Sequence, residues 1–146
     1  MRHAVFVMAA ALLVAPAIAS TDPGLSDAIM NWKDDASVGC KNPQSTYDMN
    51  TCAGRDYKKS YTALVALYNQ LYAKYDAANK KRLQIAQRSW RKYMDDECGY
   101  ETAGTIGGTI HSTMVTNCNA ALTEVRIKQL QAQLNCAEGD MGCNAP

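Results

Sequence analysis

Six cysteines carry the most distinctive chemistry in this sequence. They are Cys40, Cys52, Cys98, Cys118, Cys136 and Cys143. Cysteines bind metal ions as thiolates or pair as disulfides, and their spacing distinguishes the two cases. No two of them form a C-x-x-C pair, and beyond His3 the sequence holds a single histidine, His111. The pattern predicts three disulfides, with no metal and no cofactor.

The other residue types that could carry a reaction are poorly arranged for one. His111 and Ser112 are neighbours in sequence, which a catalytic pair rarely is, and no G-x-S-x-G motif accompanies them. On a helix the run Asp95-Asp96-Glu97 points in three directions, unlike the carboxylate pair of a glycosidase. The segment Thr105–Thr109 lacks the lysine of a phosphate-binding loop. We therefore expect no enzymatic activity.

Two long helices would position these residues. The first is expected from Ser45 to about Tyr75, with Ser45 or Thr46 as the N-cap. Its apolar stripe consists of Tyr57, Tyr61, Leu64, Tyr68, Leu71 and Tyr75. A turn at Asp76–Asn79 precedes a second helix from about Lys80 to Cys98. Its expected inward residues are Leu83, Ala86, Trp90 and Tyr93 or Met94.

A tight turn makes these two helices antiparallel, which fixes the residues that face each other. The expected pairs are Leu71 with Leu83, Leu64 with Trp90, Tyr61 with Met94, and Tyr57 with Cys98. Trp90 is predicted to be the central anchor of the core. Arg88 points elsewhere and is expected to pair with Asp95 or Glu124.

A third helix completes the predicted bundle. The connection Gly99–Ser112 is rich in glycine and threonine, which predicts a long and mobile loop. A helix from about Thr113 to Cys136 follows it. Its expected inward residues are Met114, Cys118, Leu122, Val125 and Leu130. With a short helix between Asp22 and Asp35, which contains Ile29 and Trp32, the sequence predicts an all-α fold, a small antiparallel bundle held together by disulfides.

The same geometry sorts the cysteines into pairs. The first four fall at one end of the bundle, and the last two at the other. A disulfide needs Cα atoms within about 7 Å, so Cys136–Cys143 is the first predicted pair. We favour Cys40–Cys52 and Cys98–Cys118 for the rest, because both close local loops. The alternative, Cys52–Cys98 with Cys40–Cys118, stays open.

The N-terminus has the three parts of a secretory signal peptide. A basic start, the apolar run Ala4–Val14 and the small residues Ala17 and Ala19 predict a signal peptide at residues 1–19. Beyond it we expect an N-terminal segment at 20–44, a helical domain at 45–136 and a C-terminal tail at 137–146. Loss of Arg2 takes the basic count from 15 to 14, equal to the 14 acidic residues. Such a balanced chain is expected to bind no nucleic acid and, without a second apolar run, no membrane.

A set of these residues matches a known family. The most specific run is Gln87-Arg88-x-Trp90 followed by Asp95-x-Glu97-Cys98, and Met49-Asn50-x-Cys52 precedes it. In these residues the chain resembles the exported lysozyme inhibitor LprI-like family, over about Cys40 to Leu134. The resemblance implies a periplasmic or secreted helical domain, in a family where some members inhibit lysozyme.

The chain departs from the family pattern at neighbouring positions. The family usually has Ala-Asp where this chain has Ser60-Tyr61, Asn where it has Val65, and Arg where it has Met94. Because the register places Tyr61 opposite Met94, the departures imply an ion pair exchanged for apolar packing, which is often neutral or stabilising.

With no reaction centre, protein binding is the expected function. Loops on a rigid scaffold usually carry such a function, and the connection after the second helix is the leading candidate. The expected partner-binding residues are Asp95, Asp96, Glu97, Thr105, Gly107, Gly108, Thr109 and His111. The resemblance points to lysozyme or another peptidoglycan hydrolase as the partner. The alternative is a periplasmic structural or adaptor protein that inhibits nothing.

Overall fold

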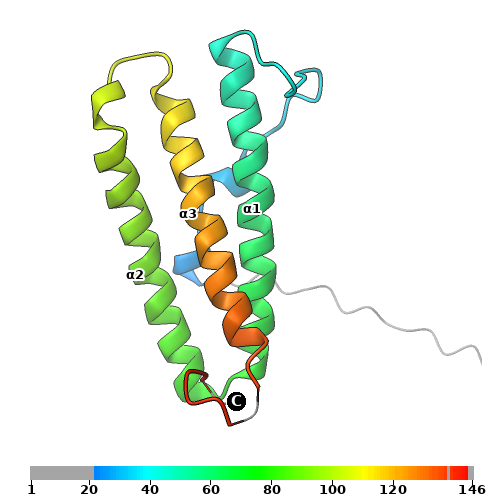
Figure 1. The fold of residues 1–146 in the computed structure, drawn as a ribbon, viewed down its shortest axis with the longest axis vertical. Coiled ribbons are helices and arrows are strands. Elements are labelled where there is room, and N and C mark those ends of the chain that lie inside the picture. Colours follow the sequence, from blue (N-terminus) through cyan, green and yellow to red (C-terminus); the bar gives the residue numbers. More distant parts are fainter. Residues whose placement is uncertain (1–21, 138, 145–146) are drawn as a thin grey trace, which may run out of the picture.

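The computed structural model describes residues 22–137 and 139–144, and within them the fold is all-α (Figure 1). Three long helices are present, α1 at Thr46–Lys74, α2 at Ala77–Glu101 and α3 at His111–Leu134. Short 3-10 turns lie at Pro23–Leu25, Ala28–Asn31 and Ala103–Thr105. No helix in the described ranges is long and apolar enough to cross a membrane. The predicted signal peptide, residues 1–19, lies outside the described residues.

The start of α1 agrees with its sequence signal. The Ser45 side chain accepts a hydrogen bond from the Asp48 amide at 3.1 Å, and the Asp48 carboxylate accepts one from the Ser45 amide at 3.2 Å. This capping box satisfies two amide groups that the helix leaves unpaired. The prediction of Ser45 as an N-cap is confirmed.

Helix α2 is longer than predicted at both ends. Asp76 caps it by accepting a hydrogen bond from the Asn79 amide at 2.7 Å, so only Tyr75 and Asp76 separate α1 from α2. At the other end α2 runs through Gly99 to Glu101. A single glycine costs a helix about 1 kcal/mol, which the packing of a long helix readily offsets.

The predicted stripe of α1 forms the core. All six of its members are buried, and Tyr61, Leu64 and Tyr68 are fully enclosed. Met94 of α2 is fully buried in the same cluster, and its sulfur accepts a hydrogen bond from Thr123 of α3 at 3.8 Å. Tyr61 and Met94 are therefore buried in one core cluster, and their direct contact stays a prediction of the register.

Two predictions about α2 are wrong. Trp90 is only partly buried and lies at the core's edge, where the Arg126 guanidinium sits 6.0 Å from its ring centroid. Arg88 lies 3.9 Å from Asp22, whereas Arg91 makes the ion pair with Asp95. Both errors arise because the register considered only α1 and α2. Arg126 of α3 lies beside Trp90, and Asp22 of the N-terminal segment lies beside Arg88. Ala86, also expected to face inward on α2, is exposed. Of the alternatives Tyr93 and Met94, it is Met94 that is buried.

The inward face of α3 also differs from the prediction. Thr113, Thr123 and Leu130 are buried, whereas Met114 and Val125 are exposed. Cys118 and Leu122 are partly buried at the margin of the core. The buried face is therefore rotated from the most apolar face, because threonine can be buried by its methyl group when its hydroxyl finds a partner.

Residues 22–31, here called the N-terminal strap, pack between the hairpin helices. Figure 1 shows the strap (blue) behind α3, so that the two segments lie on opposite sides of the α1–α2 hairpin. Asp22 accepts a hydrogen bond from the Tyr68 hydroxyl, and Asp27 accepts one from the Tyr57 hydroxyl and pairs with Arg91. The predicted short helix is thus two 3-10 turns anchored by carboxylates.

Two glycines allow the N-terminus to approach the helices closely. A Cβ atom on Gly54 of α1 would lie 2.7 Å from the Trp32 ring, which packs there just after the strap. A Cβ atom on Gly24 of the strap would lie 3.1 Å from the Arg88 amide nitrogen of α2. Neither position accepts a larger residue without a shift of its neighbours.

The three disulfides follow the favoured pairing. Cys40–Cys52, Cys98–Cys118 and Cys136–Cys143 have Cα–Cα distances of 5.6, 5.7 and 5.8 Å. The first two lie at one end of the bundle, here called the disulfide end. The third lies beyond the last turn of α3, at the end where α1 and α2 are joined.

Candidate partner-binding surface

The connection between α2 and α3 at the disulfide end is a chain of tight turns rather than a long mobile loop. Backbone hydrogen bonds join the Thr105 amide to Thr102 at 2.9 Å, the Gly108 amide to Thr105 at 3.0 Å, and the His111 amide to Gly108 at 3.2 Å. Gly107 has φ +83°, which favours glycine, and so completes the reversal. The prediction of one long loop over Gly99–Ser112 is wrong, because α2 extends to Glu101 and α3 begins at His111.

A side-chain hydrogen bond closes this connection across its base. The Thr105 hydroxyl lies 2.7 Å from the Thr102 carbonyl oxygen and 2.7 Å from Nδ1 of His111. A carbonyl can only accept, so the single hydroxyl proton goes to Thr102, and Nδ1 of His111 must carry a proton and donate it. In the neutral ring Nε2 is then the acceptor.

Asn50 of α1 fixes the start of α3 beneath the connection. Its side-chain oxygen accepts hydrogen bonds from the Ser112 hydroxyl at 2.8 Å and from the Thr113 hydroxyl. The Cys98–Cys118 disulfide joins α2 to α3 at the same level. The sequence placed Asn50 in a family motif but gave no signal of this role, because its partners lie more than 60 positions along the chain.

Large apolar side chains are exposed around the connection. Tyr100 is 80% exposed and Ile106 is 71% exposed, while Tyr47 and Met114 are also exposed at this end. Sequence reasoning missed this set, because it assigned apolar residues to the core and considered only polar residues for binding. An exposed apolar group beside polar residues is a common feature of protein-binding surfaces.

The acidic cluster is less negative than its sequence suggests. Asp95 pairs with Arg91 at 3.1 Å, and Asp96 pairs with Lys92 at 2.6 Å, each with a residue one turn earlier on α2. Asp96 also raises the pKa of the Lys92 ammonium through this hydrogen bond. Glu97 and Glu101 make no ion pair with any described residue, so the uncompensated acidic charge lies nearer the connection.

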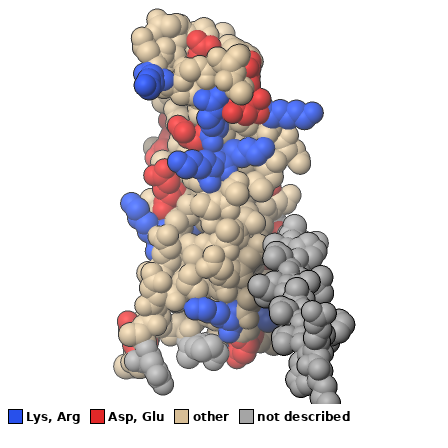
Figure 2. Space-filling view, turned by 90° about the vertical axis from the view of Figure 1, so that its right-hand side faces the viewer, with Lys and Arg blue, Asp and Glu red and all other residues tan. Residues whose placement is uncertain are grey.

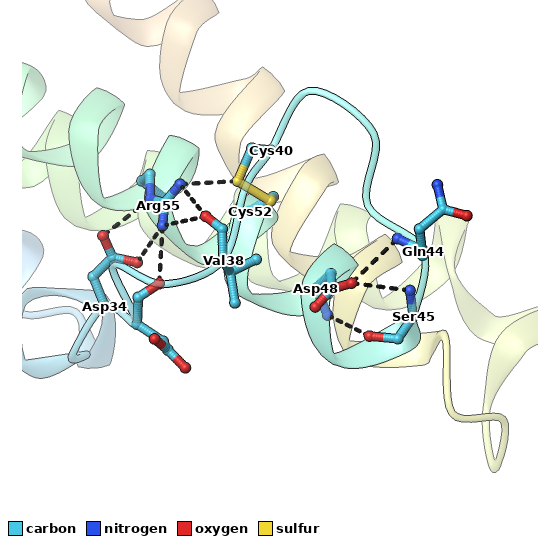
Figure 3. The surroundings of a disulfide bond; sticks show 9 residues. Asp34, Val38, Cys40, Gln44, Ser45, Asp48, Cys52 and Arg55 are labelled. Atoms are coloured by element: carbon cyan, nitrogen blue, oxygen red, sulfur yellow. Dashed lines mark hydrogen bonds and ion pairs between the residues drawn. A yellow bond between two sulfur atoms is a disulfide. The ribbon is translucent and has the colours of Figure 1, made fainter.

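A second segment is held rigid at the disulfide end. Figure 3 shows Arg55 of α1 reaching the loop before the helix, where it contacts Asp34 at 3.0 Å and donates to the Val38 carbonyl at 3.3 Å. The hydrogen bond with Asp34 raises the pKa of Arg55. Together with the Cys40–Cys52 disulfide, these contacts hold the loop against α1.

Charge is distributed unevenly along the face formed by α1 and this loop. In Figure 2 both signs gather over its upper part, toward the disulfide end, while the tip is mostly uncharged. The basic members on these elements are Lys33, Lys41, Arg55, Lys58 and Lys59, and acidic neighbours such as Asp34, Asp35, Asp48 and Asp56 are interleaved with them. Interleaved charges of opposite sign produce no strong electrostatic field. The exposed apolar residues of the α2–α3 connection are therefore the more distinctive surface at the disulfide end.

Comparison with known proteins identifies a family for this chain. The model of the family described as lysozyme inhibitor LprI matches residues 40–130. The chain belongs to this family. An uncharacterized protein of Rhizobium meliloti (strain 1021) is 29% identical over 112 residues, which is 68% of this chain and 81% of the relative. No solved structure matches the chain.

The LprI match begins at residue 40 and ends at residue 130. It includes α1, α2, their disulfides and the connection to α3. It excludes the N-terminal strap and the Cys136–Cys143 disulfide, which therefore belong to the part of this chain that the family description does not reach.

Proposed function

We propose that this LprI-family chain is exported and inhibits a peptidoglycan-cleaving glycosidase, such as a lysozyme, by inserting the α2–α3 connection into the enzyme's cleft. Family membership supports inhibition, and the three disulfides support an oxidising compartment such as the periplasm. The observation that carries the proposal is the connection of hydrogen-bonded turns, in which Ile106 is exposed.

Rigidity favours inhibition because a preordered segment loses little conformational entropy on binding. Each turn of the connection is closed by a hydrogen bond, and the Cys98–Cys118 disulfide braces its base. An inhibitor of this kind presents its binding shape before it meets the enzyme.

The chemistry of the connection suits a sugar-binding cleft with two carboxyl groups. Exposed Thr109 offers a hydroxyl, and the glycines let backbone groups approach closely. Nε2 of neutral His111 can accept a hydrogen bond from the protonated catalytic acid, whereas a protonated ring can pair with the catalytic carboxylate. Ile106 and Tyr100 supply the apolar anchors that typically dominate binding energy.

Charge contributes to encounter rather than to the final contact. Asp95 and Asp96 are largely compensated by Arg91 and Lys92, so Glu101 is the better candidate to attract a basic lysozyme. Salt should then lower the association rate more than it lowers the final inhibition.

The test compares two exposed isoleucines of α2 and its connection. We expect the chain without residues 1–19 to inhibit lysozyme in a cell-wall lysis assay. Ile106→Ser should weaken inhibition about tenfold or more, as for an anchor worth over 1 kcal/mol. Ile85→Ser, on the exposed face of α2 away from the connection, should leave inhibition unchanged.

A paired polar variant tests the chemistry of the cleft. Thr109→Ala with His111→Ala, in a protein whose circular dichroism is unchanged, should also inhibit less. Absence of inhibition by the wild type against lysozymes and bacterial glycosidases would overturn the proposal and favour an adaptor. If the Ile106→Ser variant inhibits as strongly as the wild type, the binding surface lies elsewhere than the connection.

A further inference from the structure

A concave site lies at the end of the bundle opposite the candidate inhibitory surface. In Figure 1 the C-terminal tail turns back below α3 toward the start of α2. A cavity of about 300 Å³ opens there, between both helices of the hairpin and α3. Its floor is apolar and comes from Leu71, Leu83 and Leu130, all of which are buried. This volume matches the lower range of small-molecule sites.

Two arginines line this cavity, and neither has a carboxylate partner among the described residues. Arg126 of α3 is half-buried and donates to neutral amide oxygens, Gln87 at 3.2 Å and Gln129 at 3.1 Å. Arg82 of α2 donates to Asn79 at 2.9 Å. Neither arginine makes an ion pair within the described ranges, and no aspartate or glutamate lines the cavity there.

The amide contacts orient both guanidinium groups without neutralising their charge, and the Trp90 ring lies 6.0 Å from the Arg126 guanidinium. Burial lowers the pKa of Arg126, which reflects the cost of keeping a cation partly out of water. An arginine buried for structural reasons usually has an acidic partner, because an unpaired charge is costly. An anion bound in the cavity would remove this cost.

The C-terminal tail forms a wall of the cavity. Asn144 lines it, and its amide donates to Gln133 at 3.2 Å. Gln133 in turn donates to the Gly142 carbonyl at 3.3 Å, and the Cys136–Cys143 disulfide holds the tail in this turn. Because the LprI match ends at residue 130, this wall is a feature of the chain that family membership does not explain.

We propose that this cavity binds a small organic anion. A carboxylate or phosphate head lies between Arg82 and Arg126, and a short apolar body lies on Leu71, Leu83 and Leu130. Guanidinium groups bind both head groups through paired, charge-assisted hydrogen bonds, and an apolar floor favours an organic anion over an inorganic one. The site is separate from the inhibitory surface, so either can be active without the other.

The first experiment titrates the full mature chain with matched probes. Hexanoate and hexyl phosphate should raise the melting temperature in a concentration-dependent way and shift the side-chain amide signals of Gln129 and Gln133 in NMR spectra. Comparing the two identifies the preferred head group. Hexanol, which has no charge, and inorganic phosphate, which has no apolar body, should bind at least tenfold more weakly. If hexanol binds as well as hexanoate, the arginines are not the reason for binding and the proposal fails.

Charge variants make the test specific. Arg82→Gln is exposed and should fold normally, and it should weaken hexanoate binding about tenfold or more. Lys81→Gln removes the same charge from the neighbouring exposed residue outside the cavity and should change binding little. If both variants bind hexanoate like the wild type, the assignment is wrong. Arg126→Gln gives a second measurement of the same contact, since glutamine keeps a hydrogen-bond donor beside Gln87.

Discussion

The two sides of the α1–α2 hairpin are filled by different kinds of interaction. On one side α3 packs along α1 through Thr123, Leu130 and partly buried aliphatic residues. On the other side the N-terminal strap is held by Asp22 and Asp27, which accept hydrogen bonds from tyrosines of α1. The first side depends on area removed from water, and the second depends on specific polar partners.

The two sides therefore depend on different properties of their residues. Apolar packing tolerates many substitutions of similar volume. A carboxylate buried against a tyrosine hydroxyl depends on that one hydrogen-bond partner. The LprI match covers α1, α2 and α3 as far as residue 130, and the strap lies outside it.

The largest expected effect is alkaline opening of the strap side. Burial raises the pKa of Tyr61 to about 12 and raises those of Tyr57 and Tyr68 further. Raised folded-state values mean that stability is complete below the ordinary value of 10.0 and falls as pH rises through 12. Ionised Tyr57 and Tyr68 would also face the strap's carboxylates.

The strap should therefore leave before the helices unfold. In a Trp90→Phe variant, fluorescence of Trp32 should change at lower pH than the helical circular dichroism signal. Simultaneous loss of both signals would mean that the two sides of the hairpin are one cooperative unit.

The next effect concerns the α3 side. Leu130→Ala should lower the free energy of unfolding by about 2–5 kcal/mol, because it leaves a cavity in a buried contact. Val125→Ala, on the exposed face of the same helix, should change it by less than about 0.5 kcal/mol. Urea denaturation measures both. Similar losses would indicate that the face of α3 is wrongly assigned.

Two glycine-to-alanine variants test how closely the N-terminal segment packs on α1. Alanine normally stabilises a helix relative to glycine by about 1 kcal/mol, and Gly99→Ala should do so because no atom lies within 4 Å of its new Cβ. Gly54→Ala should instead destabilise by about 1–3 kcal/mol, because its Cβ would press on Trp32. Thermal melts give the sign of each change. Stabilisation by Gly54→Ala would show that Trp32 packs loosely.

The smallest effects compare two buried tyrosine hydroxyls. Tyr68→Phe should cost about 1–2 kcal/mol, since Asp22 loses a hydrogen-bond donor. The Tyr61 hydroxyl has no hydrogen-bond partner among the described residues, so Tyr61→Phe should be neutral or slightly stabilising. Chemical denaturation resolves the difference, and an equal cost for both variants would reveal a partner for Tyr61.

Sequence patterns predicted those parts of the fold that depend on local signals. The stripe from Tyr57 to Tyr75, the Ser45 cap and the three cysteine pairs each follow from short-range spacing. The inward face of α3 was not predicted correctly, because the buried Thr123 is a polar residue by type. The position of Trp90 was not predicted because it involves Arg126, which belongs to another helix.

The candidate site likewise has features that local sequence patterns predict and features that depend on distant contacts. The glycines and threonines located a connection between the second and third helices but wrongly predicted one long loop. Its tight turns depend on backbone hydrogen bonds, and its base is held by Asn50, which lies 62 positions from Ser112 in sequence. The compensation of Asp95 follows from its spacing to Arg91 and could have been found with the rule for residues one turn apart. The cavity that we propose binds an anion is lined by residues of three helices and the C-terminal tail, and no local sequence pattern predicts such a combination.

The cysteine connectivity has a consequence for how the chain is made. Each disulfide joins a cysteine to the next one in sequence, with separations of 12, 20 and 7 residues, and no bridge spans another. If the chain is exported N-terminus first, as the predicted signal peptide implies, each of Cys40, Cys98 and Cys136 meets its partner as soon as the following cysteine appears. An oxidase that simply joins successive thiols yields the native set, and the chain can mature without an enzyme that reshuffles wrong bridges.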